Sequence, residues 1–195
     1  DTPALLLRSG IGGPAAGDYL RLHPATVVLG VYDAPQKGWW GPPQTGLSDE
    51  FAAYDDGYGF LIETSHASPG MTAPAVSWAG GEQHKHEMSR SPVTSGLVFL
   101  IRDRGHGRVT IDAAGDPVHE YALTDPGDQR VFRRGIAELI RLHDAAGAQE
   151  IATVHRKPTR WGRGEDLETF THQAHDGPLD PYEHAIFALH QMGSA

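Results

Sequence analysis

His190, close to the end of the chain, is the residue whose type and surroundings first suggest catalysis. Residues 179–195 have the pattern of a short helix, because Asp180 is a good N-cap residue and Pro181 suits the first helical position. At helical spacing His190 falls at the edge of the apolar stripe, whereas His184 falls on the opposite, solvent-facing side. Two interpretations stay open: His190 is a base held by packing and open to a ligand, or a partly buried histidine near a helix end.

Gly10 and Gly12 form a second candidate site. Residues 1–13 predict a helix that Thr2 caps and that Gly10 is placed to end. A Gly-x-Gly pair can bring backbone amides close to a phosphate, but the dinucleotide-binding fingerprint needs a strand before its glycines. The end of the helix is therefore the favoured role for Gly10.

Two adjacent tryptophans, Trp39 and Trp40, stand in a predicted long loop over residues 33–56. Loops of this length are uncommon unless they form lids or binding segments. Three interpretations stay open for the pair: the rim of an apolar ligand site, an anchor onto a neighbouring domain, or packing of the loop on its own scaffold.

His84 and His86 have a spacing that is worth testing for metal binding. The segment around them predicts a helix, in which side chains two residues apart point in nearly opposite directions. Two such rings cannot share one metal ion, so we expect a solvated helix face and no metal site.

The composition argues against several classes of function. A net charge of −9 argues against nucleic acid or an anionic membrane surface as the main partner. Gly (24) and Pro (14) together make up about a fifth of the 195 residues, which predicts many turns and long loops. The chain has no cysteine, so disulfides, thiolate metal sites and a cysteine nucleophile are excluded.

Neither a membrane span nor a targeting segment is recognisable in the sequence. No apolar run reaches the roughly 18 residues of a spanning helix, and no signal peptide is visible. We therefore expect no membrane span and favour a cytoplasmic location. The chain starts with Asp rather than Met, so we expect a processed product, an engineered fragment or an excised piece, with the natural N-terminus upstream.

Six apolar or alternating segments predict an antiparallel or mixed sheet of about five to six strands. These strands are expected at residues 25–32, 57–64, 95–103, 108–112, 118–123 and 148–155. We predict that the third and fourth of them form a hairpin, because only the short turn Arg104 to Gly107 separates them.

One long helix is predicted from Thr124 to Ala146, with Gly147 as its stop. Its apolar residues recur at helical spacing, so we expect it to cover one face of the sheet. Residues 157–177 are polar and Gly-rich and are interpreted as a long loop. The predicted fold class is therefore α+β, a sheet covered on one face by helices, with long Gly/Pro-rich loops.

The segment from Thr2 to Gly12 reads Thr-Pro-x-Leu-Leu-x-x-Ser-Gly-Ile-Gly. It resembles the second signature of the glucose–methanol–choline (GMC) family of flavin oxidoreductases. The next segment, which ends at His23 and Pro24, is similar to the one that follows in those enzymes. The order of strands and helix from residue 107 to residue 151 also resembles their substrate domain.

The closing motif, Pro-Tyr-Glu-His-Ala-Ile-Phe-x-x-His-Gln-Met-Gly-Ser, is most similar to the branch of that family that oxidises long-chain or fatty alcohols. The resemblance implies that a small-molecule alcohol is the substrate and that FAD is the cofactor of the complete protein. It also implies that His190 takes the hydroxyl proton while hydride passes to flavin N5.

The resemblance further implies a division of the chain. Residues 1–22 are a stub that resembles part of the flavin domain, residues 23–178 are the substrate-binding domain, and residues 179–195 are a closing helix that carries the active-site histidine. Candidates for cofactor contacts are Ser9, Gly10, Gly12 and His23. Candidates for substrate contacts are Trp39 and Trp40.

Two parts of such an enzyme are not found in this chain. The second catalytic residue, a His or Asn in the family, would follow the histidine motif, and the Gly-x-Gly-x-x-Gly strand–turn–helix for flavin would precede Thr2. We therefore expect the missing flavin domain to be a partner and the chain alone to be inactive.

A non-catalytic binding or dimerisation module is the alternative. In that case the Trp39–Trp40 loop forms part of an exposed surface that pairs two copies of the chain. An unrelated hydrolase is disfavoured, because the sequence contains no Gly-x-Ser-x-Gly nucleophile elbow.

Overall fold

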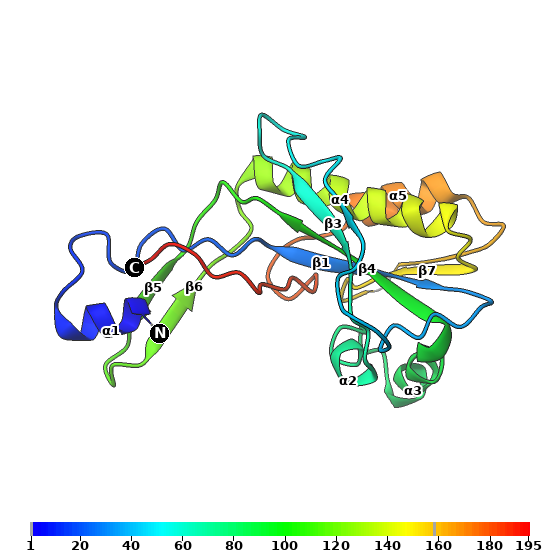
Figure 1. Ribbon diagram of the computed structural model, residues 1–195, viewed down its shortest axis with the longest axis horizontal. Coiled ribbons are helices and arrows are strands. Elements are labelled where there is room, and N and C mark those ends of the chain that lie inside the picture. Colours follow the sequence, from blue (N-terminus) through cyan, green and yellow to red (C-terminus); the bar gives the residue numbers. More distant parts are fainter. Residues whose placement is uncertain (1, 158) are drawn as a thin grey trace.

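The computed structural model describes residues 2–157 and 159–195 and has two parts (Figure 1). A larger α+β body holds most of the chain, and a small lobe holds the first helix, one two-stranded sheet and both chain ends. Residue 1, which begins the predicted N-terminal helix, and residue 158, in the predicted loop 157–177, lie outside the described residues.

The body is built on a six-stranded antiparallel sheet, in the order β2-β3-β4-β1-β7-β8. The central pair is β1 with β4, which align over seven residue pairs from Ala25↔Leu100 to Val31↔Thr94. The predicted α+β class is therefore confirmed. The strands are β1 (Ala25–Val31), β2 (Leu47–Ser48), β3 (Phe60–Thr64), β4 (Thr94–Ile101), β7 (Glu150–Thr153) and β8 (Arg160–Gly162).

Helix α4 (Pro126–Ala145) covers one face of this sheet, with α5 (Leu167–His175) beside it (Figure 1). Asp125 caps α4 by accepting a hydrogen bond from the amide of Asp128 at 2.9 Å. The buried face of α4 includes Phe132, whose ring packs edge-on against Phe99 of β4 with 4.9 Å between the ring centroids. The long predicted helix is thus confirmed, because its apolar spacing matches the covered face.

Two shorter helices, α2 (Pro69–Thr72) and α3 (Gly81–Ser89), lie on the opposite side of the sheet, and a 3-10 turn, η1 (Ser91–Val93), follows them (Figure 1). His84 and His86 are helical, as predicted. The His84 ring bonds the carbonyl of Ala73 at 3.0 Å, whereas His86 accepts from Arg90 at 3.3 Å. Across residues 2–157 and 159–195 no group of three or more His, Cys, Asp and Glu is arranged to hold a metal ion.

The small lobe combines α1 (Thr2–Ser9) with the hairpin of β5 (Arg108–Ile111) and β6 (Pro117–Glu120). Gly10 ends α1, as favoured from the sequence. Its φ is 64°, its amide bonds the carbonyl of Leu7 at 3.2 Å, and the next amide bonds Leu6 at 3.1 Å. This is the 5→2 and 6→1 hydrogen-bond pair that closes many helices.

The predicted hairpin between residues 95–103 and 108–112 is wrong. Both edges of β4 are already occupied by β3 and β1, so β5 has no edge of β4 to join. The chain instead leaves the sheet after β4 and crosses to the small lobe. The carboxylate of Asp128 accepts hydrogen bonds from the amides of Arg104 and Gly105 at 2.8 to 3.0 Å and fixes this departure.

The predicted closing helix over residues 179–195 is also wrong. The segment forms a turn at its start and then runs in extended form between the two parts. Its backbone pairs with distant residues: Phe187 with Ala25, and Met192 with Arg21, each through two hydrogen bonds of 2.8 to 2.9 Å. Asp180 and Pro181 do serve a turn, with a hydrogen bond of 3.0 Å from the amide of Glu183, but tertiary pairing overrides the helical pattern.

The predicted loop over residues 157–177 contains regular structure instead. It holds β8, which adds an edge strand to the sheet, and α5, which packs against α4. Asp166 caps α5 by accepting from the amides of Glu168 and Thr169. The polar composition of this stretch reflects an edge strand and a helix that are each exposed on one side.

None of the described helices is long and apolar enough to cross a membrane.

Gly193→Ala is predicted to loosen the terminal pairing. Gly193 has a φ of 68°, and an added methyl group would collide with the carbonyl oxygen of Tyr19. A non-glycine residue in this conformation costs about 1–3 kcal/mol, so hydrogen exchange at the Met192 amide should accelerate about 10- to 100-fold.

The matched control for this test is Gly70→Ala, because Gly70 has open space around it and an ordinary φ. Mass-spectrometric exchange on both variants measures the effect. Unchanged protection of Met192 in Gly193→Ala would show that the terminal pairing does not need this glycine.

Candidate active site

His23 and His190 meet although 167 positions separate them in the sequence. Their Nδ1 atoms lie 3.2 Å apart, and the rings are nearly perpendicular, with centroids 5.4 Å apart. His23 is half-buried and His190 is exposed. Two of the residues predicted from the sequence are thus brought together, and both are reachable from solvent.

The backbone on the His23 side of this pair is held by Asp103, which stands two residues beyond the end of β4. Its carboxylate accepts from the amides of Leu22 and His23 at 3.0 and 3.3 Å and from the hydroxyl of Tyr121 at 2.9 Å. Only 5% of Asp103 is exposed. The three donors compensate the burial of its charge and fix His23 at a φ of 46°.

Charges and burial shift the pKa values around this pair. Partial burial lowers the pKa of His23, and the neighbouring His190 and Arg102 act in the same direction, whereas the Asp103 carboxylate opposes them. Burial, followed by the charge of Asp103 and the hydrogen bond to it, raises the pKa of Tyr121, so this hydroxyl stays protonated.

Two clefts lie next to the chain segments that carry the pair, although neither His23 nor His190 itself lines them. The first, which we call the apolar cleft, has a volume of about 690 Å³ and lies between the closing segment and the loop before α3. The second, the lobe cleft, has about 790 Å³ and lies in the small lobe along residues 191–195. Leu22, Tyr121 and Ala188 line both clefts; Leu22 precedes His23, and Ala188 lies two residues before His190.

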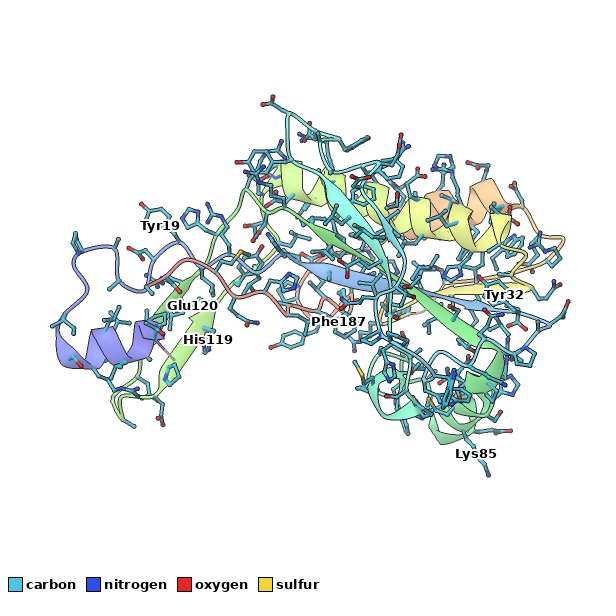
Figure 2. All side chains as sticks on the ribbon, in the orientation of Figure 1. Tyr19, Tyr32, Lys85, His119, Glu120 and Phe187 are labelled. Atoms are coloured by element: carbon cyan, nitrogen blue, oxygen red, sulfur yellow. The ribbon has the colours of Figure 1, made fainter. Side chains whose placement is uncertain are left out.

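The lining of the apolar cleft suits a long aliphatic group. Its apolar residues include Pro74, Val76, Trp78, Leu123, Leu179 and Ile186. Trp78 and Tyr182 stand at this cleft with most of their side chains exposed. Figure 2 shows Phe187 in the middle of the molecule, where the closing segment passes between the body and the lobe.

The other sequence candidates lie away from the two clefts. Trp39 and Trp40 line neither, and Trp40 is 82% exposed. Gly10 and Gly12 follow α1 at the end opposite to Thr2, Pro3 and Ala4, the α1 residues that line the lobe cleft, and Ser9 is the last residue of α1. The predicted cofactor contacts of Ser9, Gly10 and Gly12 therefore rest on the resemblance alone, and the predicted substrate contacts of the tryptophans rest on the loop pattern alone.

Sequence reasoning missed Trp78, Asp103 and Tyr121. Asp103 carried a recognisable signal, because a carboxylate directly after the most apolar strand must leave the sheet or be hydrogen-bonded. The other two carried no local signal, since their roles depend on which chain segments cross near them.

His184 is buried rather than solvent-facing, which corrects the helical projection. Only 7% of it is exposed, and its Nε2 lies 2.8 Å from the hydroxyl oxygen of Thr26. Because Thr26 donates its own proton to the carbonyl of Ala185 at 2.8 Å, His184 must donate through Nε2–H. The ring packs edge-on against His155 at 4.2 Å, and burial lowers its pKa to about 3.

His143 forms a second neutral buried histidine, at the other end of the body. Its Nε2 donates to the carbonyl of Val28 at 2.9 Å, and its Nδ1 accepts from the hydroxyl of Tyr32 at 2.7 Å. Tyr32 lies far from the lobe in Figure 2. Burial lowers the pKa of His143 to about 4, which keeps the ring neutral. Its bond to Val28 ties α4 to β1, so the role of this histidine is structural.

Known proteins provide an independent comparison. No protein-family model matches the chain. A GMC-type oxidoreductase of Mycobacterium tuberculosis is 36% identical over 154 residues, which are 78% of this chain and 24% of the relative. The sequence resemblance is thereby confirmed: over most of its length the chain is homologous to one part of the GMC-type oxidoreductases.

Its relatives also include long-chain-alcohol oxidases of Arabidopsis thaliana. One is 29% identical over 209 residues, which are 99% of this chain and 28% of the relative. Another is 30% identical over 163 residues, which are 80% of this chain and 21% of the relative. The chain spans about a quarter of the length of the relatives it matches.

Stability is predicted to fall with acidification because His143 and His184 are neutral when folded. Their pKa values are about 4 and about 3, against 6.5 in an unfolded chain. Below pH 6.5 the unfolded state therefore binds more protons than the folded state. Each histidine then lowers the free energy of unfolding by about 1.4 kcal/mol per pH unit of acidification, until its folded pKa is reached. Their full contribution is present above about pH 6.5.

His184→Gln isolates one of these contributions, because the amide nitrogen can still donate to Thr26 but does not titrate. Urea unfolding at pH 7 and pH 5 should show a smaller loss of stability in this variant, by about 1–2 kcal/mol. His172→Gln, at an exposed position of α5, is the control. An unchanged pH dependence in His184→Gln would contradict the assignment.

Proposed function

We propose that this chain forms the alcohol-facing part of an FAD-dependent oxidoreductase that acts on the CH–OH group of long-chain alcohols. The observation that carries the proposal is the His23–His190 contact, next to Leu22 and Ala188, which line both the apolar cleft and the lobe cleft. The named activity of the Arabidopsis relatives, oxidation of long-chain alcohols, supports the substrate class.

The residues of this chain fit one wall of a flavin site. His190 is exposed, and Ala188 and Gln191 on either side of it line the lobe cleft, which leaves room for a ring system to lie against this segment. Gly10 and its neighbours do not suit the dinucleotide phosphates, because they follow a helix and because the amide of Gly10 is used to close it. We therefore assign the phosphate-binding part to a separate flavin domain, which is the predicted partner.

When bound, the flavin supplies a two-electron acceptor for the hydride of the carbinol carbon. The contribution of His190 is to accept the hydroxyl proton at a ring nitrogen, so that the C–O bond becomes a carbonyl as the C–H and O–H bonds break. The apolar cleft holds the alkyl chain and excludes water from it, which places the hydroxyl end near the histidine pair.

The domain division follows from the same proposal. Residues 1–22 and the closing segment 179–195 contribute to the surface that meets the flavin domain, and residues 23–178, apart from the β5–β6 hairpin, form the substrate-binding part. The β5–β6 hairpin belongs with the first of these surfaces, because it packs with α1 in the small lobe.

His190→Asn is predicted to slow alcohol-dependent flavin reduction strongly when the chain is joined to its flavin domain. Loss of a general base lowers such rates by about 10²- to 10⁴-fold. Stopped-flow absorbance of the oxidised flavin, with alcohols of increasing chain length, measures the effect. In the wild-type protein the rate of flavin reduction should rise with the length of the alkyl chain of the alcohol.

The control is His172→Asn, on the exposed side of α5. Flavin reduction at the wild-type rate in His190→Asn would overturn the assigned base. The chain alone should purify without colour, and stoichiometric flavin bound to it would contradict the division into two domains.

A dimerisation module is the second candidate, and the 82% exposure of Trp40 favours it. Large exposed aromatic side chains are enriched at protein interfaces. Analytical ultracentrifugation should then show a concentration-dependent dimer that Trp40→Ser removes, with Trp78→Ser as the matched control for exposure. A strict monomer at high concentration would exclude this alternative.

A further inference from the structure

The contact between His23 and His190 limits the protons on the two rings to two arrangements. Their Nδ1 atoms are 3.2 Å apart, and a hydrogen bond at this distance needs one Nδ1–H and one Nδ1 lone pair. A neutral imidazole carries one proton only. The ring that donates through Nδ1 therefore has a free lone pair at Nε2, and the ring that accepts has Nε2–H.

The two rings are not held equally. The main chain at His23 is clamped by the buried carboxylate of Asp103, which itself accepts from Tyr121. His190 lies on the extended closing segment, and its ring is exposed. His23 is thus the fixed partner, and the orientation of the His190 ring depends on the contact with it.

We propose that His23 is a positioning residue for His190: its Nδ1 accepts the Nδ1–H of His190 and keeps the Nε2 lone pair of His190 free for the proton of an alcohol. The role of His190 as base rests on the proposed function, but the tautomer does not. Once Nε2 takes a proton, the Nδ1–H bond to His23 remains, and the Asp103 carboxylate still accepts from the main-chain amide of His23.

The reverse arrangement is chemically distinct. If His23 donated to His190, then His190 would carry Nε2–H and would have no free lone pair at that atom. It would then be unable to accept a proton there. The arrangement of protons in the pair therefore decides whether His190 is ready to act as a base.

Long-range ¹H–¹⁵N NMR of the histidine rings tests the proposal on the chain itself. At a pH where both rings are neutral, His190 should show a protonated Nδ1 and an unprotonated Nε2. His23→Asn should preserve this pattern, because asparagine tolerates positive φ and places an acceptor oxygen near the former Nδ1. His23→Gly, which also tolerates the backbone, should lose it and give a mixture of tautomers.

His143 provides the folding control within the same spectra, because its Nε2–H bond to Val28 should be unchanged in every variant. His172→Asn, at an exposed position of α5, should leave the His190 signals unaltered. An Nε2–H tautomer for His190 in the wild type, or an unchanged His190 pattern in His23→Gly, would overturn the proposal.

Kinetics on the chain joined to its flavin domain separate this inference from the proposed function. His23→Gly should lower kcat about tenfold with little change in KM, and His23→Asn should restore most of the loss. If His190→Asn is inactive but His23→Gly is not impaired, the positioning role fails and the function stands. If the tautomer is as proposed but His190→Asn is active, the function fails and the structural role stands.

Discussion

The buried carboxylate of Asp103 is the contact on which the arrangement around His23 and His190 depends. It lies just beyond β4, where the chain leaves the sheet, and it accepts hydrogen bonds from Leu22, His23 and Tyr121. Leu22 and His23 lie on the segment that leads into β1, and Tyr121 lies on the segment that follows β6; both segments cross between the small lobe and the body. A buried charge with all its donors present is strongly directional, so this carboxylate aligns the crossing segments as well as the His23 backbone.

The closing segment supplies the second set of contacts that arranges the histidine pair. It pairs with the chain on both sides of His23, at Arg21 and at Ala25, and so brings His190 to its partner through backbone hydrogen bonds rather than through a helix. Extended pairing of this kind leaves the side chains of Ala188 and Ile186 free to line the clefts. The extended pairing of the closing segment therefore produces both the apolar cleft and the histidine pair.

Structure that depends on contacts between residues close in sequence could be predicted, whereas structure that depends on distant contacts could not. The span of α4, the glycine that ends α1 and the apolar strands depend on local interactions, and the sequence predicts each of them. The helical pattern of the closing segment is misleading because Phe187 and Met192 pair with Ala25 and Arg21, more than 150 positions away. His184 was placed in solvent for the same reason, since its contact with Thr26 comes from another strand. The approach of His23 to His190 had no sequence signal, although both residues were candidates.

The position of β1 between β4 and β7 has a consequence for the order in which the molecule folds. A strand near the start of the chain must wait for partners at residues 94–101 and 150–153 before both of its edges are paired. Closing such long loops slows folding, because their entropy is lost before the contacts are gained. The histidine pair forms only when the last residues settle on this finished sheet, so its NMR signature reports completion of the fold and not only the state of a site.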